Sequence, residues 1–127
     1  MARQNDLTSQ TGWADQLTVL QTIKDALDRF NADRDWAQFH TPKDLAMALN
    51  VEAAELLELL LWKRTDEELD TERLAQELSD VLITTLNLAS RLQIDLAAAT
   101  QDKIADNALK YPVAKAKGKA LKYDALD

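Results

Sequence analysis

A chain of 127 residues is long enough for one domain with a real core but short for two. Two glycines and two prolines beside 46% hydrophobic and 29% charged residues favour an all-helical fold. The net charge of −7 argues against a protein that binds nucleic acid through a basic face, and the lack of cysteine removes disulfide and thiol chemistry.

Membrane insertion and export are not expected from this sequence. No apolar stretch reaches the roughly 18 residues that a membrane-spanning helix needs. The polar start MARQNDLTSQ lacks the apolar region of a signal peptide. We therefore expect a cytoplasmic protein without a membrane partner.

The first predicted helix runs from about Trp13 to Asn31. Its apolar residues recur at spacings of three and four, which makes one helix face apolar: Leu17, Leu20, Ile23, Leu27 and Phe30. A polar stretch with embedded aromatic residues, 32–40, follows and is predicted to be a structured connection.

The second predicted helix begins with a strong start signal. Thr41 offers a hydroxyl cap, Pro42 suits the first turn, and the Asp44 carboxylate complements the helix dipole. This helix is predicted to run to about Trp62.

Two further helices are predicted after a polar linker. The third covers about 72–92, with Asp70 or Thr71 as its cap, and is apolar on most sides. Asp95 is predicted to cap the fourth, which ends near Tyr111 because a proline follows and cannot continue it.

Short joints between these helices predict an all-α four-helix bundle. The bundle domain is expected to cover residues 1–112, followed by a lysine-rich tail, 113–127, that is either flexible or draped over a neighbour. One small bundle cannot cover every apolar side of the third helix. We therefore expect a homo-oligomer, a dimer or a tetramer.

Two acidic pairs interrupt the apolar second and third helices. Glu52 and Glu55 form the first pair, and Glu77 and Asp80 form the second. Three-residue spacing places the members of each pair on nearly the same helix face. If the two helices pack side by side, four carboxylates converge, and their mutual repulsion calls for a cation.

The ligand chemistry indicates which cation. All four groups offer oxygen only, and the single histidine, His40, lies outside both pairs. Oxygen ligands suit Mg²⁺, Ca²⁺ or Mn²⁺, and Mg²⁺ typically binds a few carboxylates together with waters and substrate phosphates. A simpler interpretation remains open, in which the acidic residues of the second helix form a solvated stripe.

Four sequence blocks resemble a known family when they are taken together and in order. RDWAQFHTP, LNVEAAELLELLLWK, QELSDVLI and DKIADNALKYP are similar to the MazG-like superfamily of all-α nucleoside triphosphate pyrophosphatases, and most of all to its dCTP pyrophosphatase branch. The resemblance covers most of the chain up to Pro112. It implies hydrolysis of a nucleoside triphosphate to the monophosphate and pyrophosphate, a nucleotide-pool house-cleaning reaction.

The resemblance also implies roles for individual residues. The metal ligands would be Glu52, Glu55, Glu77 and Asp80, with Glu52 or Glu55 activating the water. The phosphate-binding residues would be Lys103, Asn107 and Tyr111. The residues around the base and sugar would be Trp36, His40, Trp62 and Thr84. Thr84 stands where relatives often have tyrosine, which changes the floor of the pocket.

Other functions are compatible with the same residues. The chain could be a non-catalytic nucleotide or metal sensor built on the same bundle, although every acidic position of the signature is present. It could also be a structural helical module whose acids are surface charge. Trp36 and Trp62 could then be core or interface anchors, and His40 a structural hydrogen-bonding residue.

Overall fold

The computed structural model describes residues 13–64 and 66–127, and these form helices and no strand. The all-α prediction is therefore confirmed over this part of the chain. Residues 1–12 of the predicted domain, and the side chain of Leu17, lie outside what the structure describes. The helices are α2 (Trp13–Asp33), α3 (Pro42–Leu60), α4 (Thr71–Arg91), α5 (Leu96–Lys110) and α6 (Val113–Ala116), with 3-10 turns η1 (Ala37–Phe39), η2 (Asp66–Glu68) and η3 (Tyr123–Ala125).

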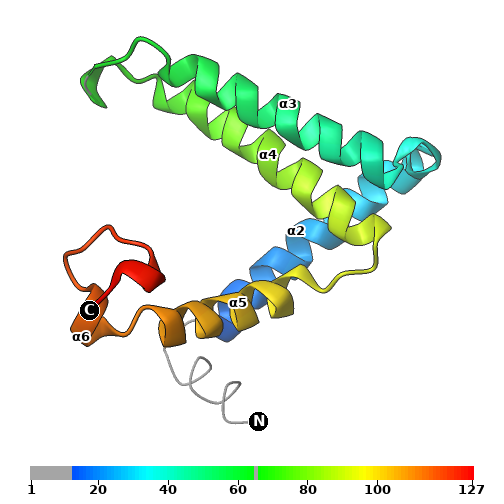
Figure 1. The fold of residues 1–127 in the computed structure, drawn as a ribbon. Coiled ribbons are helices and arrows are strands. Elements are labelled where there is room, and N and C mark those ends of the chain that lie inside the picture. The colour runs from blue at the N-terminus through cyan, green and yellow to red at the C-terminus, as the bar shows by residue number, and fades with distance from the viewer. Residues whose placement is uncertain (1–12, 65) are drawn as a thin grey trace. The chain divides into compact units, whose positions relative to one another are not determined.

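The chain divides into two compact units. The first comprises residues 22–94, and the second comprises residues 95–127 together with the segment up to Gln21. Within the first unit, α3 and α4 run side by side in opposite directions (Figure 1). The interior of this unit is small and includes Leu45, Leu86 and Ala89. The four-helix bundle as a whole stays a prediction.

The predicted helix starts are confirmed by their capping hydrogen bonds. The Thr41 hydroxyl accepts from the backbone N–H of Asp44 at 3.2 Å, and Pro42 occupies the first turn of α3. Asp70, rather than Thr71, caps α4. Asp95 caps α5 by accepting from the N–H of Ala98 at 3.0 Å.

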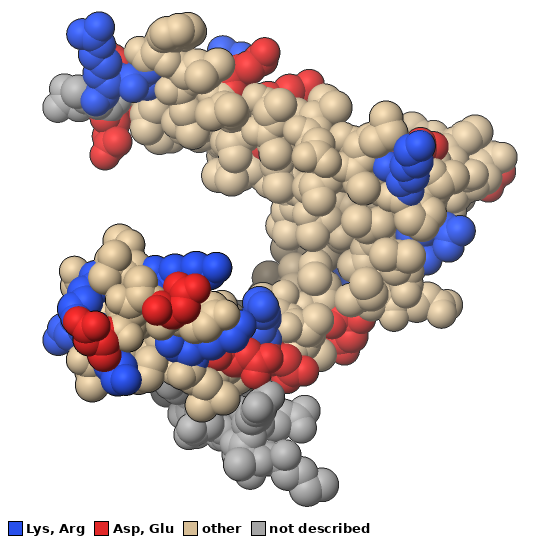
Figure 2. Space-filling model, in the orientation of Figure 1, with Lys and Arg blue, Asp and Glu red and all other residues tan. Residues whose placement is uncertain are grey.

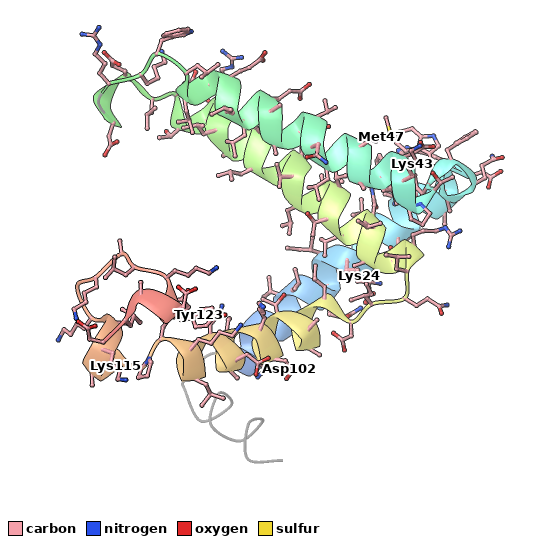
Figure 3. All side chains as sticks on the ribbon, in the orientation of Figure 1. Lys24, Lys43, Met47, Asp102, Lys115 and Tyr123 are labelled. Atoms are coloured by element: carbon pink, nitrogen blue, oxygen red, sulfur yellow. The ribbon has the colours of Figure 1, made fainter. Side chains whose placement is uncertain are left out.

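Two polar side-chain bridges join the C-terminal half of α2 to α4. The Asn31 amide donates to Asn87 Oδ1 at 2.8 Å, and the Ser90 hydroxyl donates to Asp28 Oδ1 at 2.8 Å. Lys24, which projects from α2 (Figure 3), forms an ion pair with Asp28. Burial acts to raise the pKa of Asp28, but the hydrogen bonds from Lys24 and Ser90 and the charge of Lys24 together lower it. These bridges fix the register of α2 on α4.

The C-terminal segment of the second unit is organised by aromatic contacts. The rings of Tyr111 and Tyr123 meet edge to face with their centroids 6.1 Å apart. The Lys110 ammonium lies 5.2 Å from the centre of the Tyr123 ring, and Figure 3 shows Lys115 and Tyr123 in this part of the chain. The predicted tail thus contains α6 and η3, while its flexibility stays a prediction.

Candidate functional site: an acidic cluster and an aromatic cavity

The acidic cluster lies where α3 and α4 face each other. Glu52 and Glu55 stand one turn apart on α3, and Glu77 projects from α4. One carboxylate oxygen from each of the three lies within 4.8 Å of the others. The sequence predicted that the carboxylates converge if the two helices pack side by side. The helices do so, and three of the four predicted ligands lie together.

Two of these carboxylates have an oxygen that accepts no hydrogen bond from any described residue. Glu52 Oε2 and Glu77 Oε2 are buried and have no hydrogen-bond partner among the described residues. Burial and the neighbouring charge of Glu55, with smaller contributions from Asp80 and Glu77, raise the pKa of Glu52. A buried acceptor without a donor is costly, and a cation between the carboxylates would remove that cost.

Asp80 stands at the margin of the cluster. It lies close enough to contribute to the raised pKa of Glu52, but its oxygens are outside the group of three that lie within 4.8 Å. The donor set of the cluster is carboxylate oxygen throughout. That chemistry fits a hard divalent cation such as Mg²⁺ or Mn²⁺ rather than zinc or copper.

A cavity of about 250 Å³ lies beside α4 in the same unit. Its walls are mostly apolar and aromatic, with two amides and the imidazole as the polar groups. The lining residues are Leu27, Phe30, Asn31, Trp36, His40, Ile83 and Asn87. Two of the residues predicted to surround a base and sugar, Trp36 and His40, thus share one cavity.

Backbone hydrogen bonds hold Trp36 in this position. The Trp36 N–H donates to the carbonyl oxygen of Asn31 at 3.0 Å. Asp35, just before it, adopts a left-handed conformation with φ of 52°, which aspartate tolerates better than most residues. The resulting turn sets the Trp36 ring edge to face against Phe30, with centroids 5.6 Å apart.

Thr84 and Trp62, also predicted near the base, do not line this cavity. Thr84 is buried in α4, and its hydroxyl donates to the carbonyl oxygen of Asp80 at 2.9 Å. Trp62 is 93% exposed and follows α3 in a left-handed conformation with φ of 65°. Neither residue lines the cavity that contains Trp36 and His40. Their roles stay predictions.

The predicted phosphate-binding residues lie on α5 and just beyond it, in the second unit. Lys103 and Asn107 are exposed on α5, and Tyr111 caps its C-terminal end. Spacings of four place the three along one stripe of the helix. The acidic cluster belongs to the other unit, so contact of these three residues with a triphosphate stays a prediction.

Sequence reasoning missed Asn31, Asn87 and Phe30 as lining residues. Phe30 is predicted only as part of the apolar face of the first helix, and the structure shows it in the wall of the cavity. The two asparagines are 56 positions apart, and their pairing depends on how α2 crosses α4. For each asparagine, the only local sign of this role in the sequence is that a polar residue interrupts an apolar stripe of its helix.

A second cavity, of about 360 Å³, shares part of its wall with the aromatic cavity. Asn31, His40 and Asn87 line both cavities. The rest of its lining combines two alanines with four polar residues, so it is more polar than the aromatic cavity: Ala32, Ala37, Asp28, Ser90, Arg91 and Gln93.

The chain is similar to known proteins over most of its length. Residues 47–126 match the profile of the MazG-like family. The dCTP pyrophosphatase 1 proteins of Bos taurus and Mus musculus are each 40% identical to this chain, over 85% of it and 68% of the relative. The crystal structure of a pyrophosphatase from Archaeoglobus fulgidus is similar, with a TM-score of 0.67 at 36% identity, over 72% of this chain and 91% of that one.

Proposed function

This chain belongs to the MazG-like family and is a nucleoside triphosphate pyrophosphatase, and we propose that it hydrolyses dCTP or a modified dCTP with Mg²⁺. The products would be the nucleoside monophosphate and pyrophosphate, which fits a house-cleaning role in the nucleotide pool. The observation that carries the proposal is the convergence of Glu52, Glu55 and Glu77, with two buried oxygens lacking a partner.

The acidic cluster would hold the metal. Glu52, Glu55 and Glu77 supply the converging oxygens, and Asp80 lies near enough to join them. Divalent ions bound there would neutralise charge on the triphosphate and favour in-line attack by water. Manganese could replace magnesium, because both accept carboxylate and water oxygens.

Different side chains of this protein would have different roles in the chemical step. Glu52 or Glu55 would orient the attacking water and take its proton. The water oxygen forms a bond to the α-phosphorus while the bond to the α–β bridging oxygen breaks, and pyrophosphate leaves with that electron pair. Lys103 would balance the charge that develops on pyrophosphate, and Asn107 and Tyr111 would position phosphate oxygens by hydrogen bonding.

The nucleoside end of the substrate would occupy the aromatic cavity. Trp36 offers a flat surface for a base, and His40 offers a polar group at the same cavity. Trp62 and Thr84 are proposed to complete the surroundings of the base and sugar. The 93% exposure of Trp62 leaves its ring available for a ligand or another chain.

A homo-oligomer, a dimer or a tetramer, would cover the apolar surface of the first unit. Figure 2 shows that uncharged residues cover most of the visible face over α3 and α4. Large apolar side chains are exposed on both helices, namely Met47, Val51, Leu57, Leu60, Leu78 and Leu82.

No helix in the described part of the chain is long and apolar enough to cross a membrane. We propose a cytoplasmic location, where nucleotides are available.

A substrate panel tests the proposal directly. Pyrophosphate release from dCTP, 5-methyl-dCTP, dTTP, dATP and dGTP is measured with Mg²⁺, with Mn²⁺ and with EDTA. We expect metal-dependent release with a cytosine nucleotide preferred. Tight nucleotide binding without any product would instead favour the non-catalytic sensor.

A further inference from the structure

The amide pair formed by Asn31 and Asn87 has unused hydrogen-bonding capacity. Asn31 Nδ2 donates to Asn87 Oδ1 at 2.8 Å, although Asn31 is only 7% exposed. Each amide carries two donor hydrogens and one acceptor oxygen. Within the described residues, neither Asn31 Oδ1 nor Asn87 Nδ2 makes a further hydrogen bond, and neither is among the fully buried unpartnered atoms. The pair thus presents one free acceptor and one free donor group to accessible space.

That accessible space includes the aromatic cavity. Asn31 and Asn87 line it together with Trp36, Phe30 and Ile83. Apolar walls with a few convergent polar groups are typical of sites that bind small planar ligands. A heteroaromatic ring with a donor and an acceptor on one edge has the chemistry that these residues complement.

The cavity also stands in a suitable position relative to the acidic cluster. Asp80, Ile83 and Asn87 follow one another along one stripe of α4, at spacings of three and four residues. With a helix rise of about 1.5 Å per residue, Asp80 and Asn87 are separated by about 10 Å along the axis. A sugar can lie between a base at Asn87 and phosphates at the carboxylates.

We infer that the Asn31–Asn87 amide pair contacts the edge of the nucleobase and decides which nucleotide is preferred. The inference rests on the proposed function, since it assigns a specificity role within the same site. Asn87 Nδ2 donates to a ring nitrogen or carbonyl oxygen of the base, and Asn31 Oδ1 accepts from an amino group or ring N–H. Stacking on Trp36 tolerates every base, whereas paired polar groups reject bases that leave them unsatisfied.

Two substitutions of Asn87 separate base recognition from helix packing. Asn87→Leu keeps the number of side-chain heavy atoms but removes both polar atoms, including the acceptor for Asn31. Asn87→Asp keeps an acceptor for Asn31 Nδ2 but removes the donor, so the link between α2 and α4 is retained. In both variants we expect the ratio of kcat/KM for the preferred nucleotide over the others to fall about tenfold, as loss of one hydrogen bond predicts.

Ser90→Ala is the matched control. It breaks the hydrogen bond to Asp28, the other side-chain bridge between the same helices, and Ser90 does not line the aromatic cavity. This variant should lose stability but keep the wild-type selectivity ratios. Unchanged ratios in both Asn87 variants would overturn the inference, as would an equal loss of selectivity in Ser90→Ala.

A binding measurement keeps the inference testable even if the protein hydrolyses nothing. The affinities of dCMP, dTMP, dAMP and dGMP for wild type and Asn87→Asp are measured by calorimetry in EDTA. Differences between bases in wild type that shrink about tenfold in the variant support the amide pair, whatever the outcome for hydrolysis. Equal discrimination in both proteins, or none in wild type, refutes it. Failure of hydrolysis alone counts only against the proposed function.

Discussion

Glu52 on α3 and Glu77 on α4 direct carboxylate oxygens to within 4.8 Å of each other, and each also buries an oxygen that no described residue satisfies. The two residues are far apart in sequence and meet only because α3 and α4 pack side by side. Like charges this close are unfavourable in the metal-free protein. The cluster therefore lowers the stability of the metal-free protein until a cation binds.

Addition of Mg²⁺ should raise the thermal unfolding midpoint. A ligand that binds only the native state stabilises it, by about 2.7 kcal/mol when its concentration is 100 times Kd. The shift can be measured by scanning fluorimetry with and without EDTA. Glu77→Gln should reduce it strongly. An equal shift in wild type and Glu77→Gln would show that the metal binds elsewhere.

Glu55→Gln should abolish most of the turnover while leaving the fold intact. The substitution removes a charged oxygen from the cluster, or the base itself, and loss of a general base typically costs about 10²-fold or more. Glu58→Gln is the matched control, because Glu58 is an exposed glutamate one turn further along α3 and outside the cluster. Rates are compared at saturating Mg²⁺ and nucleotide. Similar losses in both variants would indicate a general charge effect.

The stability of the metal-free protein should depend on pH through Glu52. Its pKa in the folded state is raised above the ordinary value of 4.5, so the folded state holds this proton more tightly than the unfolded chain. The corresponding stability is present below pH 4.5 and is lost as the pH rises through the folded-state pKa. Glu52→Gln mimics the protonated form. As the pH rises, its free energy of unfolding should therefore increasingly exceed that of wild type.

Denaturant unfolding of both proteins in EDTA, from pH 4 to pH 8, measures this difference. The two free energies of unfolding should be most alike at the acid end, and the Gln variant should be favoured above it. Excess Mg²⁺ should reverse the order at pH 7, since only wild type retains the full charge for the metal. A constant difference across the pH range would contradict the raised pKa.

Trp36 and Trp62 should respond differently to alanine substitution. Trp36→Ala removes a cavity wall and the contact with Phe30, so we expect lower stability and weaker nucleotide binding, by roughly 1–3 kcal/mol for the lost stacking. Trp62 is almost fully exposed, so its loss should change the stability of the protomer by no more than about 0.5 kcal/mol. If Trp62 also contacts the base, KM should rise without loss of stability. Urea unfolding and steady-state kinetics measure both effects.

Lys103→Ala should lower kcat because it removes a cation proposed to balance charge on the leaving pyrophosphate. Removing one such group in other enzymes typically costs about 10²-fold in kcat. Lys115→Ala is the control, since Lys115 is an exposed lysine of the same unit on the short helix α6. Equal rates in Lys103→Ala and wild type would remove Lys103 from the site.

The sequence predicted the helices well where local chemistry decides them. Thr41, Asp70 and Asp95 each cap a helix where a side-chain oxygen could accept a backbone N–H, and this is a property of a few adjacent residues. Spacing alone placed Glu52 and Glu55 on one face of α3. That Glu77 faces them depends on helix packing, which periodicity leaves open.

The aromatic cavity shows where local reasoning ends. Trp36 and His40 were implicated only through resemblance to a family, and the turn that orients Trp36 depends on a hydrogen bond to the Asn31 carbonyl and a left-handed Asp35. The Asn31–Asn87 pair joins two helices, so neither asparagine alone carries a signal. Thr84 stays a predicted residue of the base and sugar surroundings, and the structure shows its hydroxyl donating to the carbonyl oxygen of Asp80 in its own helix.

The small interior of the first unit has a consequence for how this protein is handled. Leu86 is fully buried, yet many leucines and valines of α3 and α4 remain in contact with water. In the proposed homo-oligomer, folding and self-association would be coupled, so that the melting midpoint climbs with protein concentration and falls on dilution. Assays run at nanomolar enzyme would sample a less stable species than those run at micromolar enzyme.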